Sequence, residues 1–249
     1  MKIICSIWWG EIGGFFDGKE RPVETEAIDR ELIALTKKQH PKVLFLPTAS
    51  WDSKGYISNF TNYYTSLGCE VDTLLLHDKF VDPTVLKKKI LSTDLIYVGG
   101  GNTLKMMKLR KKVWLIPLLQ QAHKKGIILS GLSAGGICWL HGGMSDSRQF
   151  SNKDAGFIIV KGLDFAPFYF CPHFDRDVKR KEFLPDFIKK THKKWIVLEE
   201  GTAFLIKRKQ RKIIKSKPQA HAYLGFHNRG EIIYSDLKTA DFQSLSIFS

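Results

Sequence analysis

The feature that most restricts the fold of this chain is a regular alternation of short apolar runs with amphipathic stretches. The apolar runs have the length of strands and occupy residues 3–8, 43–46, 71–76, 95–98 and 127–129. The stretches that follow them have helical spacing and occupy residues 24–38, 56–67, 83–91, 103–109, 114–124 and 134–140. Strands that alternate with helices form βαβ units, whose right-handed crossovers build a parallel sheet covered on both faces. The sequence therefore predicts an α/β fold with a mostly parallel central sheet and helices on both sides.

The pattern loosens after about residue 150, where fewer segments have a clear period. A strand is expected at 195–198, and antiparallel strands are expected at 203–207, 222–227 and 231–234. Asn, Arg and Gly at 228–230 are typical of a turn between two paired strands. No Pro/Gly/Ser-rich linker, repeat or low-complexity tract interrupts the chain. We therefore expect a single domain, residues 1–249, with a small antiparallel C-terminal part.

The composition excludes several classes of protein. Hydrophobic residues make up 43% and charged residues 26%, values that are ordinary for globular chains and unlike disordered or fibrous ones. No apolar run approaches the roughly 20 residues of a membrane span, and the apolar start is too short for a secretion signal. The four cysteines lie far apart without a Cys-x-x-Cys pair, which indicates neither a zinc site nor a disulfide framework. A cytoplasmic protein without membrane contact is expected.

The net charge of +14 is the one unusual property of the composition. Such an excess is compatible with nucleic acid, acidic substrates or an anionic surface as partners. The basic residues are densest at 207–217, where Ile213 and Ile214 interrupt them. A basic run around apolar residues is more typical of the solvated turn and outer face of a hairpin than of a binding surface. No aromatic residues are interleaved there, so nucleic acid is not the expected partner.

Residues 131–136, Gly-Leu-Ser-Ala-Gly-Gly, follow an apolar run and precede another. A buried strand that breaks at glycines around one serine and then enters a helix has the pattern of a nucleophile elbow. Small residues beside Ser133 permit the tight turn that exposes the serine oxygen to a carbonyl carbon. The alternative is an ordinary turn between a strand and a helix, because Gly-x-Ser-x-Gly also occurs by chance. Ser133 is the candidate nucleophile.

The strand at 95–98 ends in three glycines, Gly99, Gly100 and Gly101. Ligands bind beyond the carboxyl ends of parallel strands, so this loop and Ser133 are expected at the same edge of the sheet. The loop lacks the third glycine and the acidic residue of a dinucleotide fingerprint. Its exposed amides, together with that of Ala134, instead suit the two donors that a tetrahedral oxyanion requires.

A nucleophilic serine requires a base, and His173 is the best placed of the eight histidines. It follows an apolar run and Pro172, whereas His141 lies too far along the elbow helix to reach Ser133. A packed core histidine is the alternative. For the acid that orients the base, Glu199 and Glu200 follow an apolar strand. Three aspartates remain open as alternatives: Asp146, Asp175 and Asp177.

Four segments together, Val98–Thr103, Gly131–Gly135, Pro172–Phe174 and Glu200–Thr202, resemble the peptidase E (aspartyl dipeptidase) family of serine peptidases, to which cyanophycinase is related. The resemblance covers most of the chain. It implies a fold like that of class I glutamine amidotransferases, with serine in place of their cysteine. By position it also implies that Ser133 is the nucleophile, His173 the base and Glu200 the acid, and that Gly100 or Gly101 and Ala134 form the oxyanion hole. An aspartate downstream of the serine is the family's alternative acid, and Asp146 is the nearest match.

The resemblance implies hydrolysis of short peptides with an acidic first residue, by a Ser-His-Glu triad and an acyl-enzyme. Hydrolysis of β-aspartyl bonds and a non-catalytic binding protein on the same fold are the alternatives. Arg176 and Arg180 follow His173 closely and are the candidates for binding the substrate carboxylate, with Lys179 as a weaker one. All three could instead line the solvated start of a helix. We expect a small peptide as the partner and no metal or organic cofactor, and a homodimer stays open.

Overall fold

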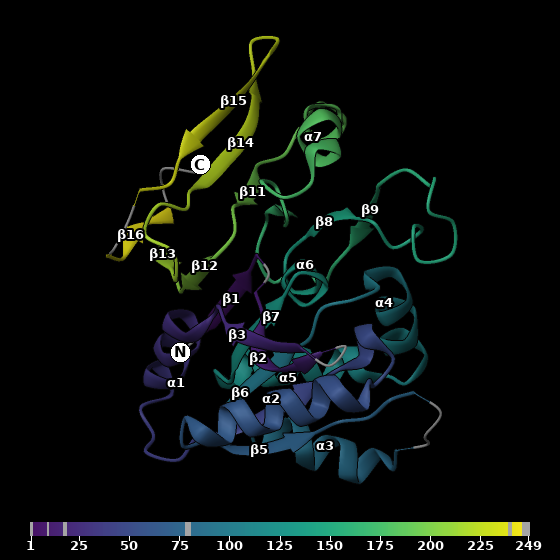
Figure 1. Ribbon diagram of the computed structural model, residues 1–249, viewed down its shortest axis with the longest axis vertical. Helices are drawn as coiled ribbons and strands as arrows, with labels where there is room; N and C mark the ends of the chain where they lie inside the picture. Colours follow the sequence, from purple (N-terminus) through teal and green to yellow (C-terminus); the bar gives the residue numbers. More distant parts are fainter. Residues whose placement is uncertain (1, 9, 17–18, 78–80, 239–240, 246–249) are drawn as a thin grey trace.

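A computed structural model describes residues 2–8, 10–16, 19–77, 81–238 and 241–245 (Figure 1). The larger sheet contains five neighbouring parallel strands and three antiparallel ones at one side. In spatial order its strands are β16 (Gln243–Ser244), β13 (Gln210–Lys215), β12 (Thr202–Lys207), β1 (Ile3–Ile7), β7 (Ile128–Leu132), β6 (Leu95–Val98), β4 (Lys42–Leu46) and β5 (Glu70–Thr73). The parallel part confirms the α/β fold that the alternating pattern predicts.

Helices cover both faces of this sheet, because its central strands are apolar on both sides. Alternate residues of a strand point to opposite faces. In β4, Phe45 therefore packs with Phe60 and Tyr64 of one layer, while Leu46 packs in the cluster of the other layer. One layer contains α1 (Glu26–Thr36) and α2 (Lys54–Ser66), and the other contains α3 (Pro83–Leu91), α4 (Thr103–Lys112) and α5 (Leu115–Lys125).

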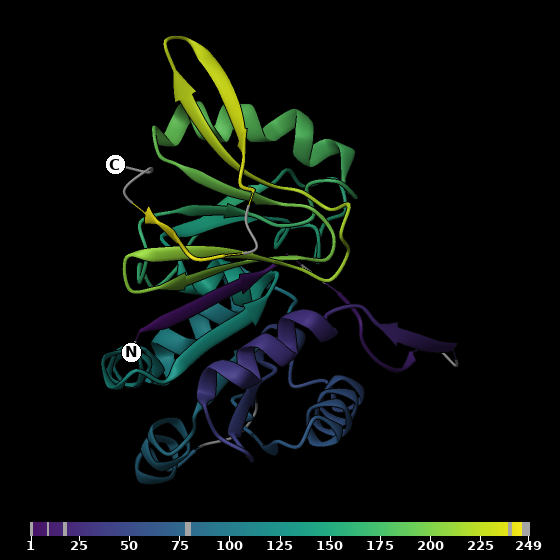
Figure 2. The ribbon, with the colours of Figure 1, turned by 90° about the vertical axis from the view of Figure 1, so that its left-hand side faces the viewer.

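A second sheet packs against the same core and is larger than the small antiparallel part that the sequence predicts. Its central strands β8, β10 and β11 are parallel, and its outer strands are antiparallel. The helix α7 (Val178–Thr191) packs on its other face (Figure 2). In spatial order the strands are β15 (Glu231–Asp236), β14 (Ala222–Asn228), β11 (Trp195–Leu198), β10 (Tyr169–Cys171), β8 (Gly142–Ser145) and β9 (Ile158–Lys161).

The strands β2 (Ile12–Phe16) and β3 (Lys19–Val23) follow the first strand along the chain and pair as a hairpin. Figure 2 shows it extending from the body of the molecule, apart from both large sheets. The sequence pattern did not indicate these strands. The short helix η1 (Thr48–Ser50) follows β4, and α6 (Ala134–Trp139) follows β7, so both lie beyond the carboxyl ends of parallel strands.

The basic segment 207–217 forms the end of β12, a tight turn at Arg208 and Lys209, and the strand β13. This is the hairpin arrangement that the sequence predicts for it. Two of its lysines bind within the molecule, since Lys212 pairs with Glu31 at 2.9 Å and Lys217 pairs with Glu24 at 3.3 Å. None of the described helices combines the length and the apolar character needed to cross a lipid bilayer.

Candidate active site

Ser133 lies between β7 and α6 in a strained turn, with φ of 52° and ψ of −107°. The residues around it are small because the backbone leaves no room for side chains. A Cβ at Gly131 would lie 2.6 Å from the carbonyl carbon of Gly135, and one at Gly135 would lie 2.1 Å from the carbonyl oxygen of Val98. Such strain is typical of a residue held in place for function, and here it exposes the Ser133 hydroxyl at the sheet edge.

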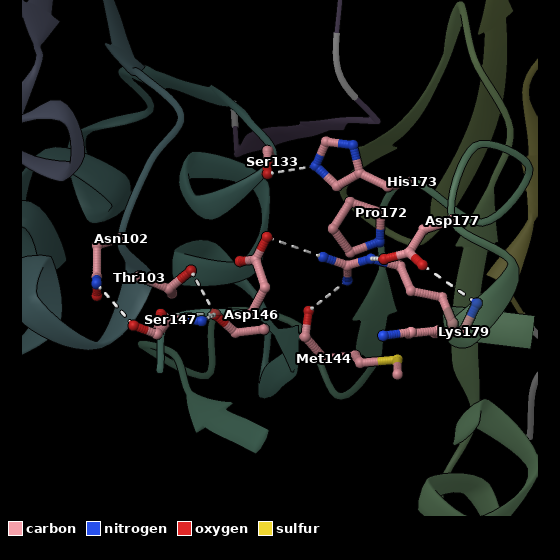
Figure 3. Close-up of polar contacts among 12 residues, drawn as sticks. Asn102, Thr103, Ser133, Met144, Asp146, Ser147, Pro172, His173, Asp177 and Lys179 are labelled. Carbon is pink, nitrogen blue, oxygen red and sulfur yellow. Dashed lines mark hydrogen bonds and ion pairs between the residues drawn. The ribbon is translucent and has the colours of Figure 1, made fainter. Parts of the chain in front are cut away.

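His173 is the candidate base for the Ser133 hydroxyl. Its Nε2 lies 2.8 Å from Ser133 Oγ, a hydrogen-bond distance, although the two residues are 40 positions apart (Figure 3). His173 follows β10 and Pro172 and itself has a positive φ of 60°. Its ring lies 5.2 Å from the ring of Trp8, which packs beside it at the end of β1. Two strained residues from separate sheets thus face each other across this contact.

The electrostatic surroundings of His173 keep its imidazole neutral. Removal of the ring from water, together with the positive charges of Arg180 and Arg176, lowers its pKa to about 3. A general base must be unprotonated to accept a proton. His173 is therefore in its base form at all ordinary pH values.

The loop after β6 supplies backbone amides beside Ser133. The Gly100 amide donates a long hydrogen bond of 3.4 Å to the hydroxyl of Tyr56. Gly101 has a φ of 134°, and a Cβ there would lie 2.2 Å from the carbonyl oxygen of Ala49, so only glycine fits. Ala134 is the first residue of α6, where amides point out of the helix without an intrahelical partner. These groups could hold an oxyanion, as the sequence predicts.

A hydroxyl network that sequence reasoning missed fixes this loop to the second sheet (Figure 3). The side-chain amide of Asn102 donates a hydrogen bond to the carbonyl oxygen of Ser147 at 2.9 Å. The Ser145 hydroxyl donates a hydrogen bond to the Thr103 hydroxyl at 3.2 Å. The Ser147 hydroxyl accepts from the amide of Leu104 at 3.0 Å. The network holds the glycine loop in register with the residues that follow β8.

Glu200, the expected acid, lies against two cations, Arg176 and Lys217. Its carboxylate accepts hydrogen bonds from Arg176 at 3.0 and 3.2 Å and binds Lys217 at close range. Although burial raises the pKa of Glu200, the hydrogen bond from Lys217 and the charge of Arg176 bring it below its usual value. Arg176 and Lys217 therefore bind the Glu200 carboxylate, and the role of Glu200 as the acid of the site stays a prediction.

The other candidate acids also have partners other than His173. Asp146 lines the cavity beside Ser133 and pairs with Arg180 at 3.4 Å. The remaining three candidates accept hydrogen bonds from other groups. Asp175 accepts from the backbone amide of Glu200, and Asp177 caps the start of α7. Glu199 accepts from the backbone amide of His221 and from the hydroxyl of Tyr223. The third member of the site beside Ser133 and His173 therefore stays a prediction.

Arg176 and Arg180, which are expected to bind the substrate carboxylate, pair with carboxylates of the protein itself. Arg176 binds Glu200, and its guanidinium lies 5.9 Å from the ring of Trp8. Arg180 is only 2% exposed, donates to the carbonyl oxygen of Met144 at 3.1 Å, and pairs with Asp146 and Asp177. Neither arginine is among the residues that line the cavity. The alternative of a wholly solvated helix start is also wrong for Arg180, because the second sheet buries it.

Ser133 lines a cavity of about 660 Å³. This volume is within the range of pockets that hold small molecules. The cavity walls come from the glycine loop, from the start of α2 and from the β2–β3 hairpin with the residues before it. Sequence reasoning missed Glu11, Arg21 and Tyr56 in this wall, because nothing in the pattern indicated a hairpin that reaches the carboxyl edge of the sheet.

Comparison with known families places the chain in one of them. The model of peptidase family S51 matches residues 16–214, which is most of the chain and includes Ser133, His173 and Glu200. The chain belongs to peptidase family S51. This agrees with the resemblance that the four sequence segments carry.

Two relatives of this chain are themselves described as uncharacterized peptidases. YgaJ of Bacillus subtilis (strain 168) is 37% identical over 156 residues, which cover 62% of this chain and 64% of that protein. PM1590 of Pasteurella multocida (strain Pm70) is 29% identical over 140 residues, which cover 55% of this chain and 66% of that protein. The S51 chain therefore spans slightly less than two thirds of the length of these relatives.

Two solved structures share the fold. A peptidase from an acI-B1 actinobacterium superposes with a TM-score of 0.69 at 18% identity, covering 98% of this chain and 96% of that one. A putative peptidase E protein from Listeria monocytogenes EGD-e superposes with a TM-score of 0.61 at 19% identity, covering 86% and 98%. At these identities the likeness concerns the fold alone, and it agrees with the peptidase E-like architecture expected for an S51 chain.

The lowered pKa of His173 predicts an unusual acid limb for any activity of this S51 site. The free base is lost only as the pH falls through about 3, so kcat/KM should stay constant from pH 8 to about pH 5. If the base were an unperturbed histidine, with a pKa of about 6.5, kcat/KM would instead fall to half its value at about pH 6.5. The measurement is kcat/KM against pH, with circular dichroism at each pH to exclude unfolding. A decline centred near 6.5 while the chain stays folded would contradict the neutral, desolvated base.

Proposed function

We propose that this chain is a serine peptidase that hydrolyses short peptides with an acidic first residue. The observation that carries the proposal is the hydrogen bond of 2.8 Å between Ser133 Oγ and His173 Nε2 at the wall of the cavity. A nucleophile within hydrogen-bond distance of an unprotonated base is the arrangement that covalent hydrolysis needs. Membership of peptidase family S51 supports the same chemistry.

In the proposed reaction the Ser133 oxygen bonds to the carbonyl carbon of the substrate while His173 Nε2 takes the hydroxyl proton. The carbonyl electron pair moves to oxygen, and the amides of the glycine loop and Ala134 stabilise this oxyanion. When the intermediate collapses, the carbon–nitrogen bond breaks and the imidazolium gives its proton to the leaving amine. Water then attacks the acyl-enzyme with His173 again as base, which releases the acid and restores Ser133.

The proposed acid of the site, Glu200, acts through charge in this geometry. Arg176 disfavours protonation of His173, and Glu200 neutralises Arg176 by accepting two hydrogen bonds from it. An imidazolium forms in the transition state, so an uncompensated guanidinium nearby would raise the barrier. Glu200 thus supports His173 through Arg176, which suits the third role of a Ser-His-Glu site.

We expect Glu200→Gln to lower kcat/KM about 10- to 100-fold, which corresponds to about 1.4–2.7 kcal/mol. Glu199→Gln is the matched control and should have little effect, because the Glu199 carboxylate binds the His221 amide and the Tyr223 hydroxyl instead. The measurement is kcat/KM of the purified variants on one peptide. Equal losses for the two glutamates would contradict the assignment, and a loss confined to Asp146→Asn would move the third role to Asp146.

The substrate class is tested by a panel of dipeptides that differ only in their first residue. Each dipeptide ends in leucine and begins with Asp, Asn, Glu, Gln, Leu or β-linked Asp. The measurement is the rate at which free leucine is released. The proposal expects the α-linked Asp peptide to be hydrolysed fastest. Preference for the β-linked form would indicate a cyanophycinase-like isopeptidase instead. Failure of a peptide-like phosphonate to label Ser133, together with no hydrolysis, would contradict the enzyme itself.

A further inference from the structure

The cavity beside Ser133 is lined by one cationic side chain, that of Arg21, because His173 is neutral. Of the lining residues that the structure describes, Arg21 is the sole arginine or lysine, whereas Glu11 and Asp146 supply two carboxylates. A pocket with both signs of charge suits a short peptide, which carries an ammonium group and one or more carboxylates. The charge of Arg21 has no role in the hydrolysis described above, so its presence in the wall requires another explanation.

The geometry of the β2–β3 hairpin directs Arg21 toward the cavity. Arg21 pairs across the hairpin with Gly14, and cross-strand partners project from the same face of a sheet. A Cβ at Gly14 would lie 2.4 Å from the Asn59 side chain of α2, so this face of the hairpin is turned toward α2. Asn59 itself lines the cavity. Arg21 therefore leaves the hairpin on the side where the cavity lies, opposite a residue without a side chain.

Arg21 also differs from the two arginines near His173 in what it binds. Arg176 is bound to Glu200, and Arg180 is bound to Asp146 and Asp177. Arg21 is exposed, and within the described ranges of the chain its side chain has no ion pair or hydrogen bond. A guanidinium offers a planar fork that matches a carboxylate with two hydrogen bonds. An accessible guanidinium in the wall of a substrate pocket can give that fork to a ligand.

We infer that Arg21 is the specificity residue that binds a carboxylate of the peptide, an inference that rests on the function proposed above. The carboxylate has two sources, the acidic side chain of the first residue and the C-terminal carboxylate of the peptide. Both present the same planar group to the same fork. The β2–β3 hairpin is then the part of the molecule that selects short, acidic peptides, while the sheet edge performs the hydrolysis.

The test compares kcat/KM of the intact chain and of Arg21→Met on three peptides: Asp-Leu, Asn-Leu and Asp-Leu-amide. We expect Arg21→Met to lower kcat/KM on Asp-Leu about 10- to 100-fold, because a substrate carboxylate loses its partner. If the side-chain carboxylate is the one bound, only Asn-Leu escapes this loss. If the C-terminal carboxylate is bound, only Asp-Leu-amide escapes it. Equal losses on all three peptides, or no loss, would overturn the inference.

A matched control removes a positive charge from the same hairpin. Lys19 is exposed on β3, two residues from Arg21, and does not line the cavity. Lys19→Met should leave kcat/KM on Asp-Leu within about twofold, because long-range attraction between exposed charges is screened. If Lys19→Met lowered kcat/KM as much as Arg21→Met does, the loss would follow from the net charge of the hairpin, and the assignment to Arg21 would be overturned. Arg21→Lys should retain part of the rate, since lysine keeps the charge but loses the fork.

A binding experiment separates this inference from the peptidase proposal. In the Ser133→Ala chain, which lacks the nucleophile, Asp-Leu is titrated by calorimetry with and without Arg21→Met. Weaker binding, by about 10-fold or more, in the double variant supports the role of Arg21 even if the intact chain hydrolyses nothing. Identical affinities, or no binding of Asp-Leu in either chain, would overturn it. Hydrolysis without dependence on Arg21 would leave the peptidase proposal intact and reject this inference alone.

Discussion

Replacing Ser133 by alanine should reduce kcat on the preferred dipeptide by about 10⁴- to 10⁶-fold, as for other nucleophile–base pairs. In the proposed reaction the Ser133 oxygen bonds to the substrate carbonyl carbon, and this oxygen lies 2.8 Å from His173 Nε2. The residual rate would come from the amides of the glycine loop and from substrate binding. Initial rates at saturating peptide, measured at high enzyme concentration, give the comparison.

The control for this variant is its folded state. Alanine removes one oxygen from a half-buried side chain whose described hydrogen bond goes to His173, so the melting temperature should change little. Ser145→Ala is a matched serine variant, because Ser145 lies in the hydroxyl network away from the cavity wall. It should retain far more activity than Ser133→Ala. Turnover above a few per cent of the intact chain in Ser133→Ala would contradict the nucleophile.

The sequence predicts the large sheet well because its parallel strands are buried on both faces. β4 and β6 are short runs of mostly apolar residues, and the α-helices that follow them along the chain, α2 and α4, bury residues in the core. The second sheet is harder to predict because some of its elements, β8 and β10 among them, lack that signal. β8 contains two consecutive glycines, β10 has three residues, and α7 has Pro185 in its interior. These elements form because the chain packs them together, a tertiary effect that local propensity does not contain.

The candidate site follows the same division. Ser133 and Gly101 are recognisable because backbone geometry admits few residue types there, and such constraints leave a local pattern in the sequence. The partners of charged side chains leave none. Arg176 and Arg180 follow His173 closely, yet Arg176 binds Glu200, 24 positions away, and Arg180 pairs with Asp146, 34 positions away, as well as with the nearby Asp177. Arg21 lies more than 100 positions before Ser133, on a hairpin that no period indicates. Spacing along the chain therefore identifies the candidate nucleophile and misses the charge pairing around it.

Replacing His173 by alanine should cost about as much as losing the serine, on the order of 10⁴- to 10⁶-fold in kcat. Ser133 and His173 act as one unit, so the double variant should be no slower than either single variant. His173→Asn separates the chemical loss from a backbone effect, because asparagine tolerates the positive φ of 60° found at this position. Both single variants should therefore be inactive, with the asparagine variant closer in melting temperature to the intact chain.

The double variant is the sharper measurement, since it tests the pairing rather than either residue alone. If the two side chains worked independently, their losses would multiply, and the double variant would be slower than each single one by several further powers of ten. Loss of the His173 ring also removes a packing partner of Trp8, which could lower activity through the fold. Such a structural loss would lower the melting temperature as well, and it would add to the loss from Ser133→Ala. A double variant that is folded and no slower than Ser133→Ala is the result expected if His173 acts only by taking the proton from Ser133.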